Sequence, residues 1–138
     1  MRKTLFYVLS FTWGIIMTII GMCAAAGLRI IGKKPTMYGP CLCYVVGTGW
    51  GGVSLGPVMI MSEGNAKGTH TKNHEFGHAL QNCLWGPLFP FVIAIPSATR
   101  LKYRESQEKK GIELETEYDD IWFEGQATEW GHKYIDKF

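Results

Sequence analysis

The segment His70-Thr-Lys-Asn-His-Glu-Phe-Gly-His78 places His74 and His78 four residues apart. On an α-helix, residues four apart project from the same face, so both imidazoles can reach one Zn2+ at roughly 2.0–2.1 Å. Glu75 follows the first histidine, where a carboxylate can take a proton from a metal-bound water. The segment therefore predicts a zinc-binding helix. The rival interpretation is a partly buried helix whose two histidines bond to carbonyl groups.

A hydrolytic zinc site needs a third protein ligand and keeps its fourth position for water. Glu124 is the strongest candidate, because it lies on a predicted helix among aromatic and small residues. A carboxylate buried in such surroundings needs a cation as its partner. Glu129 is the next candidate, on a different face of the same helix, and His70 and His132 stay open as alternatives.

The N-terminal segment is hydrophobic enough for a membrane. The chain has 138 residues, of which 46% are hydrophobic and 19% charged, a composition between those of soluble and membrane proteins. Residues 4–28 carry no charge. A helix of that length spans about 37 Å, more than the roughly 30 Å of a bilayer core. We expect residues 1–34 to form a membrane helix with basic flanks. A cleaved signal peptide is the alternative, although its apolar region usually covers only about 7–15 residues.

The remaining residues, 35–138, are predicted to form one α+β domain, a minimal zincin core. Residues 35–61 are uncharged but rich in glycine, which favours strands joined by turns over a membrane helix. Residues 43–46 are expected to form one strand and residues 53–61 another. Pro57 places the second strand at the edge of a sheet or at a bulge.

The zinc-binding helix is expected to begin at a cap, Thr71 or Asn73, and to end at Trp85 before Gly-Pro. Residues 84–98 follow as an uncharged segment that three prolines interrupt. This segment is short for a straight membrane span, so we expect it to re-enter the membrane or to lie on its surface at least as readily as to span it.

The C-terminal third of the chain is charged. Residues 105–117 are expected to be a mobile connector, and a last helix is expected to open at Asp119 or Asp120 and to carry Glu124. After Arg100 acidic residues outnumber basic ones, and no basic stripe alternates with aromatic residues. Nucleic acid is therefore not an expected partner.

His74-Glu-x-x-His78 followed by Glu124-x-x-Ala127-Thr128 resembles the two motifs of the gluzincin metallopeptidases. Within that class the chain is similar to the membrane-bound branch of the CAAX prenyl proteases and the heat-shock membrane protease. Over most of its length it also resembles small, uncharacterised bacterial membrane proteins with a glycine-rich strand, an HE(F/Y)GH motif and a proline-broken apolar segment. This resemblance implies the bacterial cytoplasmic membrane as the location.

The gluzincin resemblance implies His74, His78 and Glu124 as zinc ligands and Glu75 as the general base. Thr128 stands where the prenyl-protease pattern has an aspartate that orients a ligand histidine. A threonine hydroxyl can accept the same N–H bond but supplies no negative charge. The resemblance therefore implies a lower affinity for the metal, or a lower activity, than the motif with aspartate would give.

In zincins a strand beside the active-site helix commonly pairs with an extended substrate. Residues 53–61, with Val53 and Leu55, precede the zinc-binding helix and are the candidates for this strand. The alternative is that they form an ordinary packed strand, which does not exclude the first interpretation.

These observations predict a membrane-anchored peptidase that hydrolyses a peptide or protein substrate with a zinc-activated water. One alternative is a non-catalytic membrane protein that zinc stabilises, and another is a metal-free membrane or interaction protein. About 110 residues follow the first helix, enough for one modest core but not for a separate specificity domain. We therefore expect the membrane bilayer, a partner chain or self-association to select the substrate.

Overall fold

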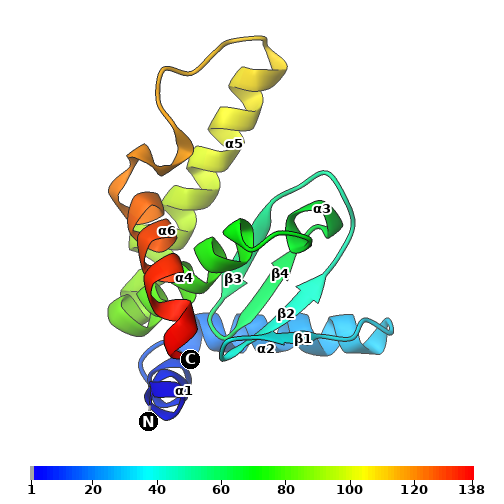
Figure 1. Cartoon of the computed structure of the whole chain (residues 1–138), viewed down its shortest axis with the longest axis vertical. Coiled ribbons are helices and arrows are strands. Elements are labelled where there is room, and N and C mark those ends of the chain that lie inside the picture. Colours follow the sequence, from blue (N-terminus) through cyan, green and yellow to red (C-terminus); the bar gives the residue numbers. More distant parts are fainter. Residues whose placement is uncertain (1) are drawn as a thin grey trace.

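A four-stranded mixed sheet forms the centre of the computed structural model, which describes residues 2–138 (Figure 1). The strand order is β1-β2-β4-β3. The parallel pair is β2 with β4, and the outer pairs are antiparallel. The strands are β1 (Thr36–Tyr38), β2 (Cys41–Val45), β3 (Gly52–Leu55) and β4 (Val58–Met61).

The strand expected at residues 43–46 is confirmed as β2, but the single strand expected over residues 53–61 is wrong. A tight turn at Gly56-Pro57 divides that segment into β3 and β4, which pair with each other. Gly56 has a φ of 63°, a left-handed conformation that glycine adopts without steric cost. As a result β3 is an edge strand, whereas β4 lies inside the sheet.

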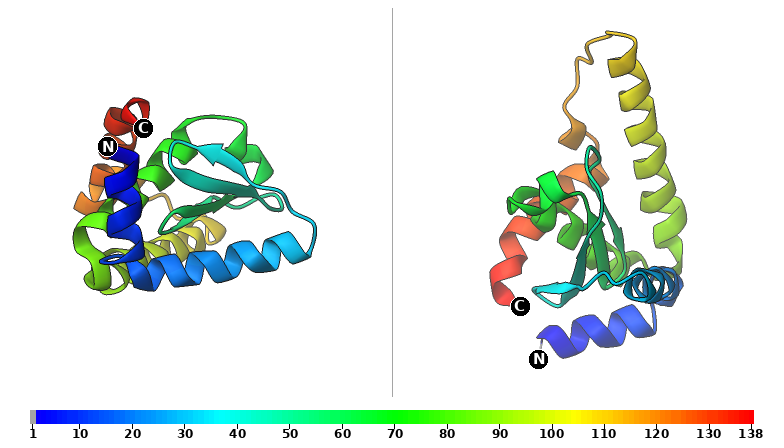
Figure 2. Two further views of the ribbon diagram at one scale, coloured as in Figure 1. Left: turned by 90° about the horizontal axis from the view of Figure 1, so that it is seen from below. Right: turned by 90° about the vertical axis from the view of Figure 1, so that its right-hand side faces the viewer.

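Helices cover both faces of the sheet (Figure 2). Alternate residues of β4 point to opposite faces, as the strand period of two requires. Met59 and Met61 pack in the core that includes Phe76 of α4 (His70–Trp85). Val58 packs on the other face against Ala25 of α2 (Ile15–Ile30).

The single helix expected over residues 4–28 is wrong, because the segment forms α1 (Arg2–Phe11) and α2 with a bend of 93° between them. The bend is held by the end of α4, since Trp13 Nε1 donates to the Leu84 carbonyl oxygen at 3.1 Å. Among residues 2–138 no single helix is long and apolar enough to cross a bilayer. Two bent pairs of helices have the combined length and apolar composition of a membrane span. They are α1 with α2, and His70–Leu88 with Pro90–Lys109.

Three other boundaries differ from expectation. Helix α4 begins at His70, with Thr69 as its N-cap, rather than at Thr71 or Asn73. Residues 105–109 are not connector but the end of a helix, and the last helix begins at Trp122 after a short turn. The elements after the sheet are α3 (Glu63–Ala66), α4, η1 (Gly86–Leu88), η2 (Pro90–Ala94), α5 (Ile95–Lys109), η3 (Tyr118–Asp120), α6 (Trp122–Tyr134) and η4 (Ile135–Lys137).

Helices α4 and α6 cross with their backbones in close contact. A Cβ atom built on Gly77 of α4 would lie 1.8 Å from the Ala127 carbonyl oxygen, and one on Gly131 of α6 would lie 1.7 Å from the Asn73 carbonyl oxygen. Both distances are too short for any side chain larger than hydrogen. The two glycines therefore set the separation of the helices, and with it the position of α6 against the histidine face of α4.

Candidate metal centre

His74, His78 and Glu124 converge on one point between α4 and α6. The two Nε2 atoms are 3.2 Å apart, and each lies 3.1 Å from Glu124 Oε2. The histidines project from one face of α4, and Glu124 comes from the first turn of α6. All three side chains are buried, with Glu124 fully removed from solvent. The structure thus brings together the two histidines and the carboxylate that the sequence singled out.

Gln81 fixes the tautomer of His78. His78 Nδ1 lies 2.7 Å from Gln81 Oε1. The Gln81 amide nitrogen donates to the Phe123 carbonyl oxygen at 2.8 Å and to Gln126 Oε1 at 3.0 Å. Gln81 Oε1 is therefore the acceptor, so the neutral His78 ring carries its proton on Nδ1 and keeps a free lone pair on Nε2.

Thr128 makes the equivalent contact to His74, with its Oγ1 atom 2.8 Å from His74 Nδ1. It lies on α6 one turn after Glu124, which brings it over the same helix crossing. Its hydroxyl can accept the Nδ1 proton, and the lone pair of His74 Nε2 then also points to the centre of the three residues.

These three atoms suit a zinc ion. Two imidazole lone pairs and a carboxylate oxygen that face one another repel unless they share a cation. In a tetrahedral zinc site with bonds of roughly 2.0–2.1 Å, ligand atoms lie about 3.3 Å apart. The observed separations of 3.1 to 3.2 Å match that spacing. Two nitrogens and one oxygen are also a ligand set typical of hydrolytic zinc, so His74, His78 and Glu124 can hold the metal.

The second oxygen of Glu124 is held by two hydroxyl groups. Ser97 of α5 donates to Oε1, and Tyr118 of η3 donates to the same atom at 3.2 Å. Burial alone would raise the pKa of Glu124. When the histidines of the metal-free protein carry a proton on Nε2, their hydrogen bonds to the carboxylate outweigh burial and lower its pKa. For Tyr118, burial raises the pKa to about 12, which keeps its hydroxyl protonated as a donor.

Glu75 lies beside these ligands but does not join them. It is buried, and within residues 2–138 no side chain donates a hydrogen bond to its carboxylate. Burial raises its pKa, an effect that His78 and His74 partly oppose. A Cβ atom on Gly52 would lie 3.0 Å from Glu75 Oε1, so the glycine of the edge strand leaves room for the carboxylate. A carboxylate with a raised pKa and no protein donor is suited to accept a proton.

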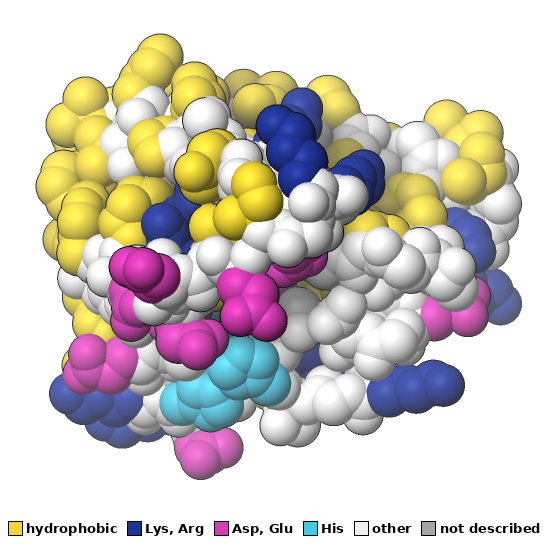
Figure 3. Space-filling model, turned by 90° about the horizontal axis from the view of Figure 1, so that it is seen from above, with side chains coloured by type: hydrophobic (Ala, Val, Ile, Leu, Met, Phe, Trp, Pro, Cys, Tyr) yellow, Lys and Arg dark blue, Asp and Glu magenta, His cyan; other side chains and the backbone are white. Residues whose placement is uncertain are grey.

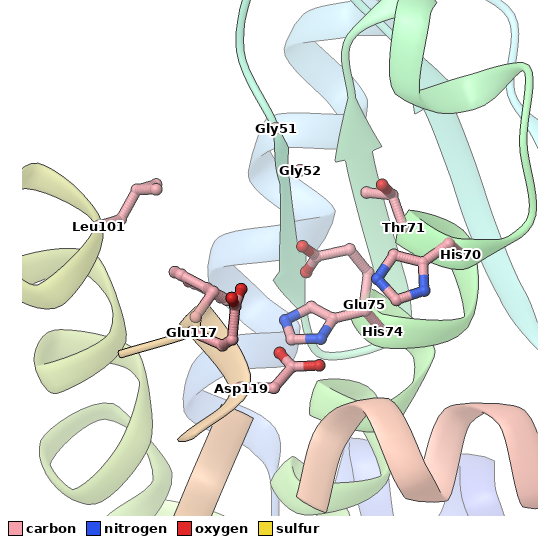
Figure 4. Close-up of a pocket in the computed structure, with 10 residues that line it drawn as sticks. Gly51, Gly52, His70, Thr71, His74, Glu75, Leu101, Glu117 and Asp119 are labelled. Carbon is pink, nitrogen blue, oxygen red and sulfur yellow. The ribbon is translucent and has the colours of Figure 1, made fainter. Parts of the chain in front are cut away.

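Glu75 lines a cleft between the edge strand β3 and helix α5 (Figure 4). One part of the cleft has a volume of about 620 Å³ and includes Gly51, His70, Thr71 and Asp119 among its lining residues. A second part of about 320 Å³ runs along Val53, Ser54 and Leu55 of β3 toward α2. Both parts reach His74 and Glu75, so an extended chain beside β3 would pass the metal centre.

The alternative third ligands lie elsewhere. Glu129 is exposed on α6. His70 and His132 face each other at the rim, with His132 Nε2 3.4 Å from His70 Nδ1, and Asn73 contacts the other nitrogen of His132. Within the described chain, the residues placed to share a metal ion are His74, His78 and Glu124.

Sequence reasoning missed two residues of the site, Gln81 and Ser97. Gln81 had a signal, because it follows His78 by three residues and so lies on the same helix face as the ligands. Ser97 had none, because only the packing of α5 beside α6 brings it to Glu124.

Comparisons of this chain with protein-family models, curated proteins and solved structures find no match. The assignment of the site therefore rests on its own geometry.

Proposed function

We propose that the chain is a membrane-anchored, zinc-dependent peptidase. The observation that carries the proposal is the convergence of His74, His78 and Glu124 on one point, with Glu75 beside them in a cleft. A zinc ion held there supplies a Lewis acid that acidifies water and polarises a carbonyl oxygen. Glu75 then accepts the proton of the attacking water and returns it to the leaving amine.

The edge strand is the proposed docking element for the substrate. Strand β3 has β4 on one side only, and its residues Val53 to Leu55 line the cleft. An extended peptide can add to such an edge through backbone hydrogen bonds and so lie across the reacting groups. Val53 and Leu55 then contact alternate side chains of the peptide.

The membrane part of the proposal rests on the N-terminal half of the chain. The first 62 residues contain no acidic side chain, and five basic residues stand near the ends of α1 and α2. Basic flanks around an apolar surface favour an anionic bilayer, and we propose the bacterial cytoplasmic membrane. The large exposed apolar side chains of α1, α2 and the turn between them include Leu5, Val8, Phe11, Trp13, Ile16, Ile19, Ile20 and Met22. Later in the chain, Leu84, Leu88, Phe91 and Ile95 are exposed as well.

The first test is zinc content per chain, measured by mass spectrometry on protein purified in detergent. We expect about one zinc in the wild type, none in the His74→Ala/His78→Ala double variant and a marked loss in Glu124→Gln. A wild type without zinc would remove the basis of the proposal.

The second test separates catalysis from metal binding. Glu75→Gln keeps the three ligands and removes the base, so we expect full zinc content together with a loss of peptide cleavage of at least 100-fold. Glu129→Gln, an exposed carboxamide change on α6, is the matched control and should cleave like the wild type. Unchanged cleavage by Glu75→Gln would contradict the role assigned to this residue.

A non-catalytic zinc protein is the second candidate, because the site joins two different helices. His74 and His78 belong to α4 and Glu124 to α6, so a bound ion would tie these helices together. This candidate predicts that chelation unfolds the protein and that the zinc-loaded chain cleaves no member of a peptide library. Cleavage that Glu75→Gln abolishes would exclude it.

A further inference from the structure

The two parts of the cleft differ in the charge of the side chains that line them. We name the part around His70, Thr71 and Asp119 the polar lobe, and the part that extends toward α2 the apolar lobe. The residues that line both lobes are Gly52, His74, Glu75, Leu101 and Tyr118. The reacting groups therefore stand at the junction, and a bound peptide has one side of its scissile bond in each lobe.

The apolar lobe has a hydrocarbon lining. Its walls come from α2, β3, η1–η2 and α5, and Glu75 is its only acidic side chain. The apolar side chains that line it include Met17, Leu55, Phe89, Ile93, Ala94 and Ala98. Such a lining removes apolar side chains of a ligand from water and leaves a charged side chain without a partner.

The polar lobe also has a largely apolar lining, and it differs from the apolar lobe in its acidic side chains. Its charged lining side chains, apart from His70 and His74, are Glu75, Glu117 and Asp119. On the same side of the molecule acidic side chains gather around the histidines, and apolar side chains lie beyond them (Figure 3). Two arginines lie close by but do not line this lobe: Arg100 donates to the carbonyl oxygens of Glu117 and Tyr118, and Arg104 donates to the Thr116 carbonyl oxygen and lies over the Tyr118 ring. A lysine or arginine side chain of a ligand therefore meets an excess of negative charge there.

The edge strand gives the bound peptide a direction. Strand β3 runs from Gly52, at the junction of the lobes, to Leu55 in the apolar lobe. Antiparallel pairing is the more stable arrangement per residue. A peptide antiparallel to β3 begins beside Leu55 and ends beside Gly52. Its N-terminal residues then lie in the apolar lobe and its C-terminal residues in the polar lobe.

We infer that the cleft selects peptides in which apolar residues precede the scissile bond and a basic residue follows it. This inference rests on the proposed peptidase function and names its substrate class. An apolar run followed by lysine or arginine is the sequence found where a membrane span reaches its basic flank. Such a substrate also agrees with a cleft whose apolar lobe includes Met17 of α2, the helix that carries much of the exposed apolar surface.

The test compares quenched fluorescent peptides of equal length and composition, cleaved by the zinc-loaded full chain in detergent. One peptide has an apolar half followed by a basic half, and the other has the reversed order. We expect kcat/KM to be at least tenfold higher for the first peptide, with the cut at the boundary by mass spectrometry. Equal rates, or a preference for the reversed order, would overturn the inference.

Two substitutions test which half of the peptide each lobe binds. Ala98→Phe places a ring in the apolar lobe and should lower kcat/KM for the preferred peptide about tenfold. Thr99→Phe, one residue further along α5 and outside both lobes, is its control. Asp119→Asn should reduce the preference for lysine over glutamine after the cut about threefold, while Glu115→Gln should not. Effects of equal size in the controls would contradict the assignment.

A measurement of peptide binding tests this inference independently of the proposed peptidase activity. Zinc-loaded Glu75→Gln is mixed with labelled peptides of both orders, and fluorescence anisotropy gives their dissociation constants. Tighter binding of the apolar-to-basic peptide, without cleavage by the wild type, would support the inference and reject the peptidase function. Equal binding of the two orders would reject the inference whatever the wild type cleaves.

Discussion

Gln81 is the residue whose role depends most on a single atom. Its Oε1 holds the Nδ1 proton of His78, and its nitrogen is anchored by Phe123 and Gln126. Partners of this kind orient a ligand histidine and raise its basicity toward the metal. Thr128 does the same for His74 through a hydroxyl oxygen, which is also an uncharged acceptor.

Removing the acceptor at position 81 should weaken zinc binding. We expect Gln81→Leu to lower the affinity about 10- to 100-fold, as loss of such a partner typically does. Gln81→Glu retains the acceptor and is the matched comparison. The measurement is competition with a chromophoric chelator, and equal affinities of wild type and Gln81→Leu would contradict the role of the side chain.

Adding charge at position 128 should act in the opposite direction. Thr128→Asp places a carboxylate against the Nδ1 proton of His74, which makes the imidazole a stronger ligand. We expect tighter zinc binding by the same competition assay, whereas Thr128→Val, which lacks the acceptor, should bind more weakly. A loss of zinc affinity in both variants would contradict this account, and would mean that the packing around position 128 controls the affinity instead of the charge of the acceptor.

At the scale of elements, the site depends on how closely α4 and α6 approach each other. Glu124 reaches the histidines because Gly77 and Gly131 let the helix backbones touch. The two histidines of α4 are four residues apart, but Glu124 is 46 residues beyond His78. Only the helix crossing brings it into place.

Gly77→Ala should therefore damage both stability and metal binding. The new methyl group would lie 1.8 Å from the Ala127 carbonyl oxygen, so the helices must separate. We expect a loss of about 1–3 kcal/mol in the free energy of unfolding, the usual cost of overpacking, with lower zinc content. The control is Gly27→Ala in α2, which has open space around it and should raise stability by about 1 kcal/mol. Wild-type zinc content in Gly77→Ala would contradict this account of the crossing.

At the scale of the whole molecule, we expect zinc binding to be coupled to folding stability. A ligand that binds only the folded state stabilises it by about 4 kcal/mol at 1,000 times its dissociation constant. For a chain of this length we expect zinc to raise Tm by about 10 °C under such conditions. The measurement is thermal unfolding by circular dichroism with zinc and with a chelator.

The rise in Tm should depend on pH. Burial tends to lower the pKa of His78, but Glu124 outweighs it, and the pKa in the metal-free protein is raised above 6.5. Below that raised pKa a proton occupies the nitrogen that zinc needs. The protonated pair with Glu124 stabilises the metal-free fold below pH 6.5, and this contribution is lost as pH rises through the raised pKa. The difference in Tm between zinc and chelator should thus grow with pH over the same range. A difference independent of pH would contradict His78 as a ligand.

The sequence by itself determined the local parts of this protein. Helical spacing put His74 and His78 on one face, and the surroundings of Glu124 marked it as a buried carboxylate that needs a cation. Glycine-rich composition was enough to separate the strands from the apolar N-terminal segment. These inferences succeed because they depend on residues within one or two turns of each other.

The tertiary structure alone decided what depends on contacts between distant residues. The apolar N-terminal segment bends where Trp13 meets the end of α4, a partner 71 residues away. The position of Ser97 at Glu124 depends on how α5 packs, which no local pattern records. The division of residues 53–61 into an edge strand and an inner strand depends on pairing across the sheet. Local propensity sets which elements form, but packing between them sets where the side chains of the metal centre meet.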